Sequence, residues 1–127
     1  MDKMKFARLV FLIAGIYGLI VLLPLYFLEA QMGRDFPPPI NHPEYYYGFI
    51  GVAIAWQLVF LILSRDPVRY RPMMVPAVLE KATYAVAVFI LFSQQRVSTF
   101  TLATALVDSI LGVLFVLAYI KTATYKT

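Results

Sequence analysis

The chain has 127 residues, of which 61% are hydrophobic and 14% are charged, and its formal net charge is +4. A domain this small has too little interior to bury so many apolar side chains, so the composition argues against a soluble fold and predicts one integral membrane domain. The absence of cysteine excludes disulfides, Cys-ligated zinc, iron–sulfur clusters and thiol redox chemistry.

Four apolar stretches predict an all-α fold, an integral membrane four-helix bundle. About 18 to 20 helical residues cross the roughly 30 Å hydrocarbon core of a bilayer. The first stretch follows basic residues, as a signal peptide does, but it is longer than a signal-peptide core and has no small-residue cleavage site, so we expect a retained helix. The predicted spans are residues 10–28, 45–63, 75–92 and 101–120.

The connection after the first span, residues 29–44, contains the run Pro37–Pro39 and a His-Pro step. Proline favours extended, polyproline-like backbone, so we predict a stiff external strap. His42 is the only histidine, and with Glu44 it provides too few ligands for a metal ion. We therefore expect neither a metal nor another cofactor.

The connection after the second span, residues 64–74, is predicted to be a basic inner turn. Asp66 suits the N-cap of a short interfacial helix, and Pro67 suits its first position. We expect the arginines to bind the phosphates of anionic lipids, with docking of a protein partner as the alternative. These arginines are Arg65, Arg69 and Arg71.

Most of the eleven basic residues lie on one side of the predicted membrane. The positive-inside rule then predicts that both termini are cytoplasmic. We expect a multi-pass protein of the inner membrane. This bias and anionic lipids explain the net charge, so no nucleic-acid partner is expected. The inner basic residues are Lys3, Lys5, Arg8, Arg65, Arg69, Arg71, Lys121 and Lys126; Arg34 and Arg96 are outside, and Lys81 is within the third span.

Asp108 is an acidic residue inside the fourth span. A carboxylate at that depth costs about 2.5 to 3.5 kcal/mol on insertion scales, so it should face the bundle. Helical spacing places it on one face with Thr104 and Gly112. Two interpretations stay open: a ligand or proton site, or a hydrogen bond between helices that fixes their packing.

The third span carries Glu80 and Lys81. Helical side chains lean toward the N-terminus of their own helix, so we expect Lys81 to extend to the inner headgroups, away from Asp108. Glu80 is expected to pair with Arg69 or Arg71, with catalysis or ligand binding as the alternative.

Further polar and aromatic residues are predicted near the same depth. Gln57 should lean toward Asp108 and contact it, with Tyr17 as a further hydrogen-bond donor. Trp56 either lines a pocket or packs in the bundle. The candidate ligand-binding residues are Tyr17, Trp56, Gln57, Tyr84 and Asp108.

Several elements of this chain resemble small bacterial four-span membrane proteins of unknown function, and the resemblance implies a fold without an activity. A more distant likeness, in topology only, is to the EXPERA group, in which acidic residues lie in an intramembrane cavity, and to the DoxX-like group. The motifs of those groups are not reproduced residue by residue, so no site residues are carried over. The elements are Trp56-Gln57, Asp66-Pro67 with Arg69 and Arg71, Leu79-Glu80-Lys81, and Asp108.

Two functions are therefore expected. The first is a non-enzymatic protein that acts through helix contacts, as an accessory subunit of a membrane partner or as a homo-oligomer. The second is a membrane-embedded binding or isomerase site for an apolar small molecule, with Asp108 and Glu80 as the acid/base groups. A small transporter ranks third, because the two halves of the chain show no convincing internal repeat.

Overall fold

The computed structural model describes residues 2–123, which are all-α. Four helical segments are long and apolar enough to cross a membrane, as the sequence predicts. In chain order the elements are α1 (Lys3–Leu22), η1 (Leu23–Phe27), α2 (Glu29–Asp35), α3 (Pro43–Arg65), η2 (Arg71–Met73), α4 (Met74–Ser93) and α5 (Thr99–Lys121).

Helices α3, α4 and α5 extend slightly beyond the predicted apolar stretches. Helix α1 begins earlier than predicted but ends at Leu22, and residues 23–27 of the predicted span form the 3-10 helix η1. The carboxylate of Asp2 accepts a hydrogen bond from the Met4 amide and caps this helix. The helix therefore includes the basic residues that precede the apolar run. A hydropathy boundary marks the hydrocarbon region, whereas a cap marks the end of the helix, so the two need not coincide.

The predicted external strap is extended over only part of its length. Residues 29–35 form α2, in which the Gln31 side chain donates to both carboxylate oxygens of Asp35 at 2.9 Å. The prolines explain why this helix ends, because a residue that precedes proline avoids helical backbone. The prediction of an extended strap was thus wrong for the residues before Phe36, which are mostly good helix formers.

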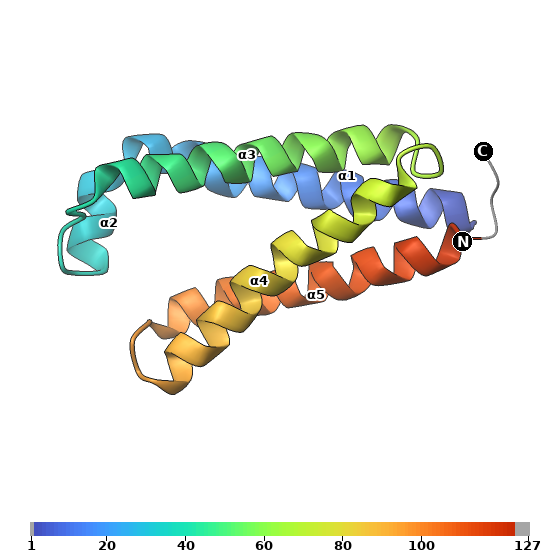
Figure 1. Cartoon of the computed structure of the whole chain (residues 1–127). Coiled ribbons are helices and arrows are strands. Elements are labelled where there is room, and N and C mark those ends of the chain that lie inside the picture. The colour runs from blue at the N-terminus through green and yellow to red at the C-terminus, as the bar shows by residue number, and fades with distance from the viewer. Residues whose placement is uncertain (1, 124–127) are drawn as a thin grey trace.

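The long helices form two antiparallel hairpins, α1 with α3 and α4 with α5 (Figure 1). Helix α1 also packs on α5, whereas α3 and α4 scarcely touch. The hairpins converge where α1 begins and α5 ends, and they spread apart toward the opposite end (Figure 1). We call these the converging end and the spreading end.

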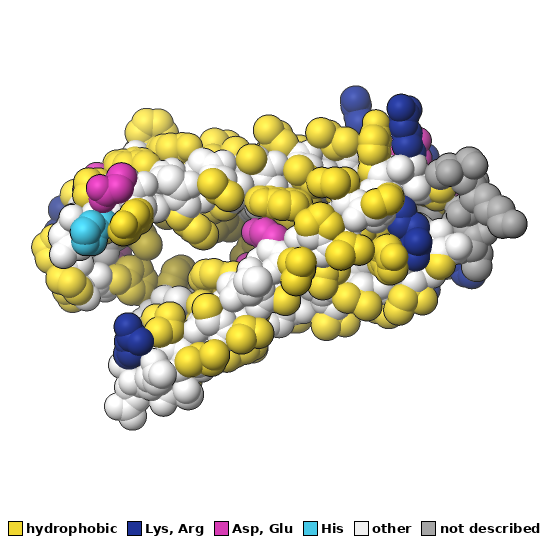
Figure 2. All heavy atoms as spheres, in the orientation of Figure 1, with side chains coloured by type: hydrophobic (Ala, Val, Ile, Leu, Met, Phe, Trp, Pro, Cys, Tyr) yellow, Lys and Arg dark blue, Asp and Glu magenta, His cyan; other side chains and the backbone are white. Residues whose placement is uncertain are grey.

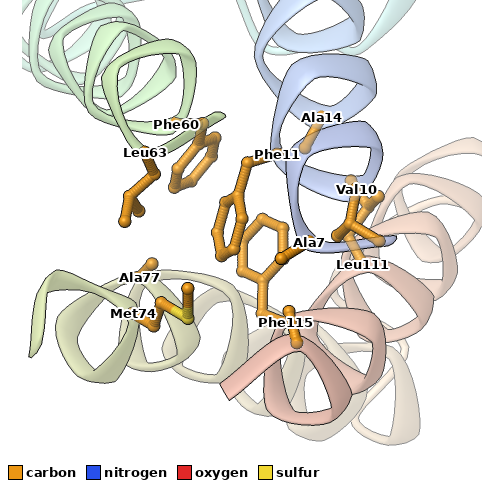
Figure 3. Close-up of a cluster of buried hydrophobic side chains, with 11 residues drawn as sticks. Ala7, Val10, Phe11, Ala14, Phe60, Leu63, Met74, Ala77, Leu111 and Phe115 are labelled. Carbon is orange, nitrogen blue, oxygen red and sulfur yellow. The ribbon is translucent and has the colours of Figure 1, made fainter. Parts of the chain in front are cut away.

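Three phenylalanines join the hairpins at the converging end (Figure 3). The ring of Phe11 stacks on that of Phe115 with 4.4 Å between centroids, and Phe60 meets Phe115 edge-on at 5.0 Å. All three side chains are fully buried. The remaining buried residues of this core are Ala7, Val10, Ala14, Leu63, Met74, Ala77, Leu111 and Ala118.

The basic inner turn also fastens the converging end. Asp66 accepts a hydrogen bond from the Arg69 amide, and it caps a turn that leads into η2 rather than the predicted short helix. The Arg71 guanidinium donates to the Tyr119 carbonyl and to the Thr122 hydroxyl, and it stacks on the Tyr119 ring. Arg71 therefore satisfies a carbonyl at the C-terminal end of α5.

Candidate functional site

A cavity of about 350 Å³ lies between the hairpins, where they begin to separate. Figure 2 shows this opening, with acidic side chains in magenta at its inner limit. The walls come from three helices, and most of their surface is apolar. The lining residues are Phe49, Val52, Ala53 and Trp56 of α3, Glu80, Thr83 and Tyr84 of α4, and Asp108 of α5.

Three charged groups meet at the bottom of this opening. The Lys81 ammonium lies 3.4 Å from Oδ1 of Asp108 and 3.6 Å from Oε2 of Glu80. It also lies 5.3 Å from the centre of the Phe60 ring, so the group touches the aromatic core. Asp108 is roughly 14 Å along α5 from its first residue, at a helical rise of 1.5 Å per residue. The charged cluster of Glu80, Lys81 and Asp108 is therefore deep in the span.

The expectation that Lys81 extends to the inner headgroups was wrong, because the residue faces α5 and not lipid. Only 4% of its surface is exposed, and it shares the buried stripe of α4 with Ala77 and Ala85. Gly112 of α5 lies directly against the lysine stem, because a Cβ placed at this glycine would be 3.4 Å from Lys81 Cβ. Lys81 consequently ends beside Asp108.

Glu80 also departs from its predicted role. It pairs with Lys81 rather than with Arg69 or Arg71, and the Arg71 guanidinium is held by α5. The Oε2 atom of Glu80 is buried and has no hydrogen-bond partner. The nearest cation to this atom is the Lys81 ammonium, at 3.6 Å.

The charges of the cluster do not balance. Two carboxylates face one ammonium, so the fully ionised cluster has a net charge of −1. An unpaired charge in a low-dielectric interior is strongly unfavourable, and it is neutralised by a proton or by a cation. This imbalance is the main chemical property of the site.

Tyrosine and threonine hydroxyls lie on the spreading side of the cluster. The Tyr84 hydroxyl of α4 is hydrogen-bonded to Thr104 Oγ1 of α5 at 2.8 Å. Tyr17 of α1 is near enough to interact electrostatically with Asp108 and Tyr84. The structure therefore brings Tyr17, Tyr84, Glu80 and Asp108 to one region.

Gln57 does not join them. Its amide donates to the Ala53 carbonyl at 2.7 Å, its Oε1 atom has no partner, and it packs against Gly18 of α1. The expected contact with Asp108 was wrong, because this side of α3 faces α1. Trp56, the preceding residue, lines the opening and also packs on Phe60.

The sequence contains a signal for the enclosed position of Lys81. Its signal was the spacing of four residues from Ala77 and from Ala85, which puts it on a stripe of small residues. Helices approach closely at small residues, so a lysine on such a stripe is enclosed instead of reaching the headgroups.

A second, smaller groove of about 270 Å³ is lined only by residues of α4 and α5. Its walls include small residues such as Ala82, Ala85 and Gly112, together with Lys81 and Asp108. The charged cluster thus separates this groove from the opening between the hairpins.

Comparison with known protein families, with characterised proteins and with solved structures finds no match to this chain. What is established is an all-α chain with four helices that are long and apolar enough to span a membrane.

Proposed function

We propose that the protein binds an amphipathic small molecule in the opening between its hairpins. The apolar body of this ligand contacts the aromatic and aliphatic walls, and its polar end meets Glu80 and Asp108. The observation that carries the proposal is the charged cluster at the bottom of a largely apolar cavity of about 350 Å³.

The cavity has the size and composition of a ligand site. Small-molecule sites occupy about 300 to 1,000 Å³ and combine apolar walls with a few converging polar groups. Ionisable residues within a membrane are expensive, at about 2.5 to 3.5 kcal/mol each on insertion scales, and they mark sites of ligand or proton binding. Acid/base catalysis by Glu80 and Asp108 would be a further property of the same site.

The test is a large side chain placed in the opening. Val52 lines the cavity and is 64% exposed, so Val52→Trp fills the opening with little effect on the core. Val75→Trp is the matched control, because Val75 is half exposed on α4 and does not line the cavity. Native mass spectrometry of protein extracted from its own membrane measures bound molecules.

We expect a molecule of defined mass on the wild-type protein and on Val75→Trp, and its loss from Val52→Trp. Equal occupancy of the two tryptophan variants, or wild-type protein that carries nothing but bulk lipid, would contradict the proposal.

A second candidate function is assembly through helix contacts, with another copy or with a partner subunit. The groove on the α4–α5 hairpin favours it, because helices in lipid associate where small residues permit close approach. Ala82→Trp fills this groove and is expected to convert an oligomer to monomers on native mass spectrometry. Wild-type protein that is monomeric and carries no partner would contradict this function.

We further propose that both termini face the cytoplasm of a cell with an inner membrane. The converging end carries the start of α1, the basic inner turn and the end of α5, where Lys121 lies over the Phe6 ring. The positive-inside rule places this end in the cytoplasm. Lys126 belongs to the same set but lies outside the described residues.

Single cysteines in this cysteine-free sequence test the direction. A cysteine at position 42 or 96 should react with an impermeant thiol reagent in intact cells, and one at position 69 should react only after lysis. The opposite pattern would reverse the orientation.

A further inference from the structure

The binding partner of the charged cluster follows from its charge balance. Lys81 is 4% exposed, and the side chains of Glu80 and Asp108 are 22% and 18% exposed, so little water screens them. The lysine forms a hydrogen bond with Asp108 but reaches Glu80 only at 3.6 Å. One ammonium balances the charge of one carboxylate, so the second carboxylate has no counter-ion.

Within the part of the chain that the structure describes, no helix lines the opening with a second positive charge. Helix α1 presents Tyr17, α3 presents Phe49 and Trp56, and α4 adds Tyr84. Over residues 2–123, the only charged groups that line the opening are Glu80 and Asp108. The counter-ion has to come from outside the chain, as a proton or as a bound cation.

We propose that the opening binds an apolar cation and that binding releases one proton from the charged cluster. This inference rests on the function proposed above, and it names the chemical class of the ligand and its coupling to protons. In the empty site one carboxyl group carries the proton and the cluster is neutral. When the cation enters, this proton leaves to solvent, both carboxylates are ionised, and the cluster with its ligand is again neutral. No covalent bond to the ligand forms.

The walls of the opening suit a cation with an apolar body. Phe49, Trp56 and Tyr84 place aromatic surface beside the acidic end of the cavity. Aromatic faces attract cations through the ring quadrupole, most strongly where water is excluded. The side chains of Glu80 and Asp108 line the same space, so a cation held by the aromatic faces lies beside both carboxyl groups. An anionic ligand would instead meet unpaired negative charge.

The experiment uses dodecyltrimethylammonium, which is charged at every pH, and dodecanol, which is neutral and has the same chain length. Binding to the full chain in phosphatidylcholine nanodiscs is measured by isothermal titration calorimetry from pH 5 to 8. The signal from Val52→Trp nanodiscs is subtracted, because it reports partition into the bilayer. Val75→Trp again serves as the matched control.

We expect the affinity for the cation to rise about tenfold per pH unit where the cluster is protonated, since one proton leaves for each cation bound. The affinity for dodecanol should not depend on pH. Glu80→Gln should weaken cation binding about tenfold and remove its pH dependence, because the remaining lysine–aspartate pair is already neutral. Asp108→Asn removes the same charge from α5, which keeps the test valid if one variant does not fold.

Two results would overturn the inference in distinguishable ways. If cation binding is blocked by Val52→Trp but does not change with pH, or if dodecanol binds as tightly, the proton exchange is wrong and the binding site stands. If neither probe gives binding that Val52→Trp removes, both this inference and the proposed function fail.

Discussion

The two ends of this bundle use similar residues for opposite purposes. At the converging end, aromatic side chains of three helices pack on one another, and Arg71 ties the inner turn to α5. Toward the spreading end, Trp56 and Phe49 line a cavity instead of filling it. Lipid gives helices no hydrophobic drive to associate, so contact at one end need not close the other. The difference teaches that stability and binding occupy separate parts of the molecule.

The charged cluster lies between these two parts. Lys81 contacts the Phe60 ring of the core, while Glu80 and Asp108 face the cavity. A change at the cluster should therefore affect both stability and binding, whereas a change at either end should affect one of them.

The largest effect is expected in the aromatic core. Phe115→Ala removes the ring that contacts both Phe11 and Phe60, and it should lower the free energy of unfolding by about 3 to 5 kcal/mol. SDS titration in detergent micelles measures this quantity. Val52→Ala at the cavity mouth is the control and should change it by less than about 1 kcal/mol. Equal losses at the two positions would contradict the division of the molecule.

Removing the ammonium from the cluster should have the next largest effect. Lys81→Met leaves two neighbouring carboxylates without a counter-ion and should cost about 3 kcal/mol. Adding Asp108→Asn to this variant should recover part of the loss, since one of the two unpaired carboxylates is then gone. Lys3→Met, on the exposed first turn of α1, is the control. Wild-type stability of Lys81→Met would show that the cluster is not ion-paired.

The three arginines of the inner turn should differ in what their loss affects, either protein stability or retention of anionic lipid. Arg71→Gln breaks the contacts with Tyr119 and Thr122 and should cost about 1 to 2 kcal/mol of stability. Arg65 and Arg69 are exposed, so Gln at those positions should leave stability within about 0.5 kcal/mol. Their loss should weaken retention of anionic lipid by about 1 kcal/mol per charge.

Lipid retention is measured by extraction and analysis of the phospholipids that co-purify. Equal lipid loss with Arg71→Gln would contradict this distinction. Loss of a protein partner with unchanged lipid would favour the docking alternative for the inner turn.

The sequence predicts the four helices well, because an uninterrupted apolar stretch in a membrane protein permits little besides a spanning helix. It predicts the members of the site less well. The depth of Tyr17, Trp56 and Asp108 follows from residue counting, but the direction of a side chain depends on which helices pair. Gln57 directly follows Trp56 in the chain, but Gln57 faces α1 whereas Trp56 lines the cavity.

The pairing of Lys81 with Asp108 was missed for a related reason. The general lean of helical side chains moves these two groups apart, but the close approach of α4 and α5 at Gly112 encloses the lysine and brings them together. Helix pairing is a property of the whole bundle, and local rules of side-chain direction do not contain it. The spread of the hairpins has the same origin, since no single segment encodes it.

The smallest effect on stability, and the sharpest test of function, is expected from Asp108→Asn. The amide keeps hydrogen-bonding capacity toward Lys81, and the cluster becomes neutral because Lys81 now faces Glu80 alone. Unfolding free energy should therefore remain within about 1 kcal/mol of the wild type or rise slightly. An amide does not exchange a proton near neutral pH, so any activity that depends on acid/base chemistry at this position should be lost, and cation binding should weaken about tenfold, as expected for Glu80→Gln. SDS titration and complementation of a deletion strain are measured together, with Ser109→Ala as the control on the neighbouring position of α5.

A stable Asp108→Asn variant that fails to complement supports the binding site. A stable variant that complements fully would make Asp108 a group that fixes helix packing, and it would move the assembly function ahead of ligand binding.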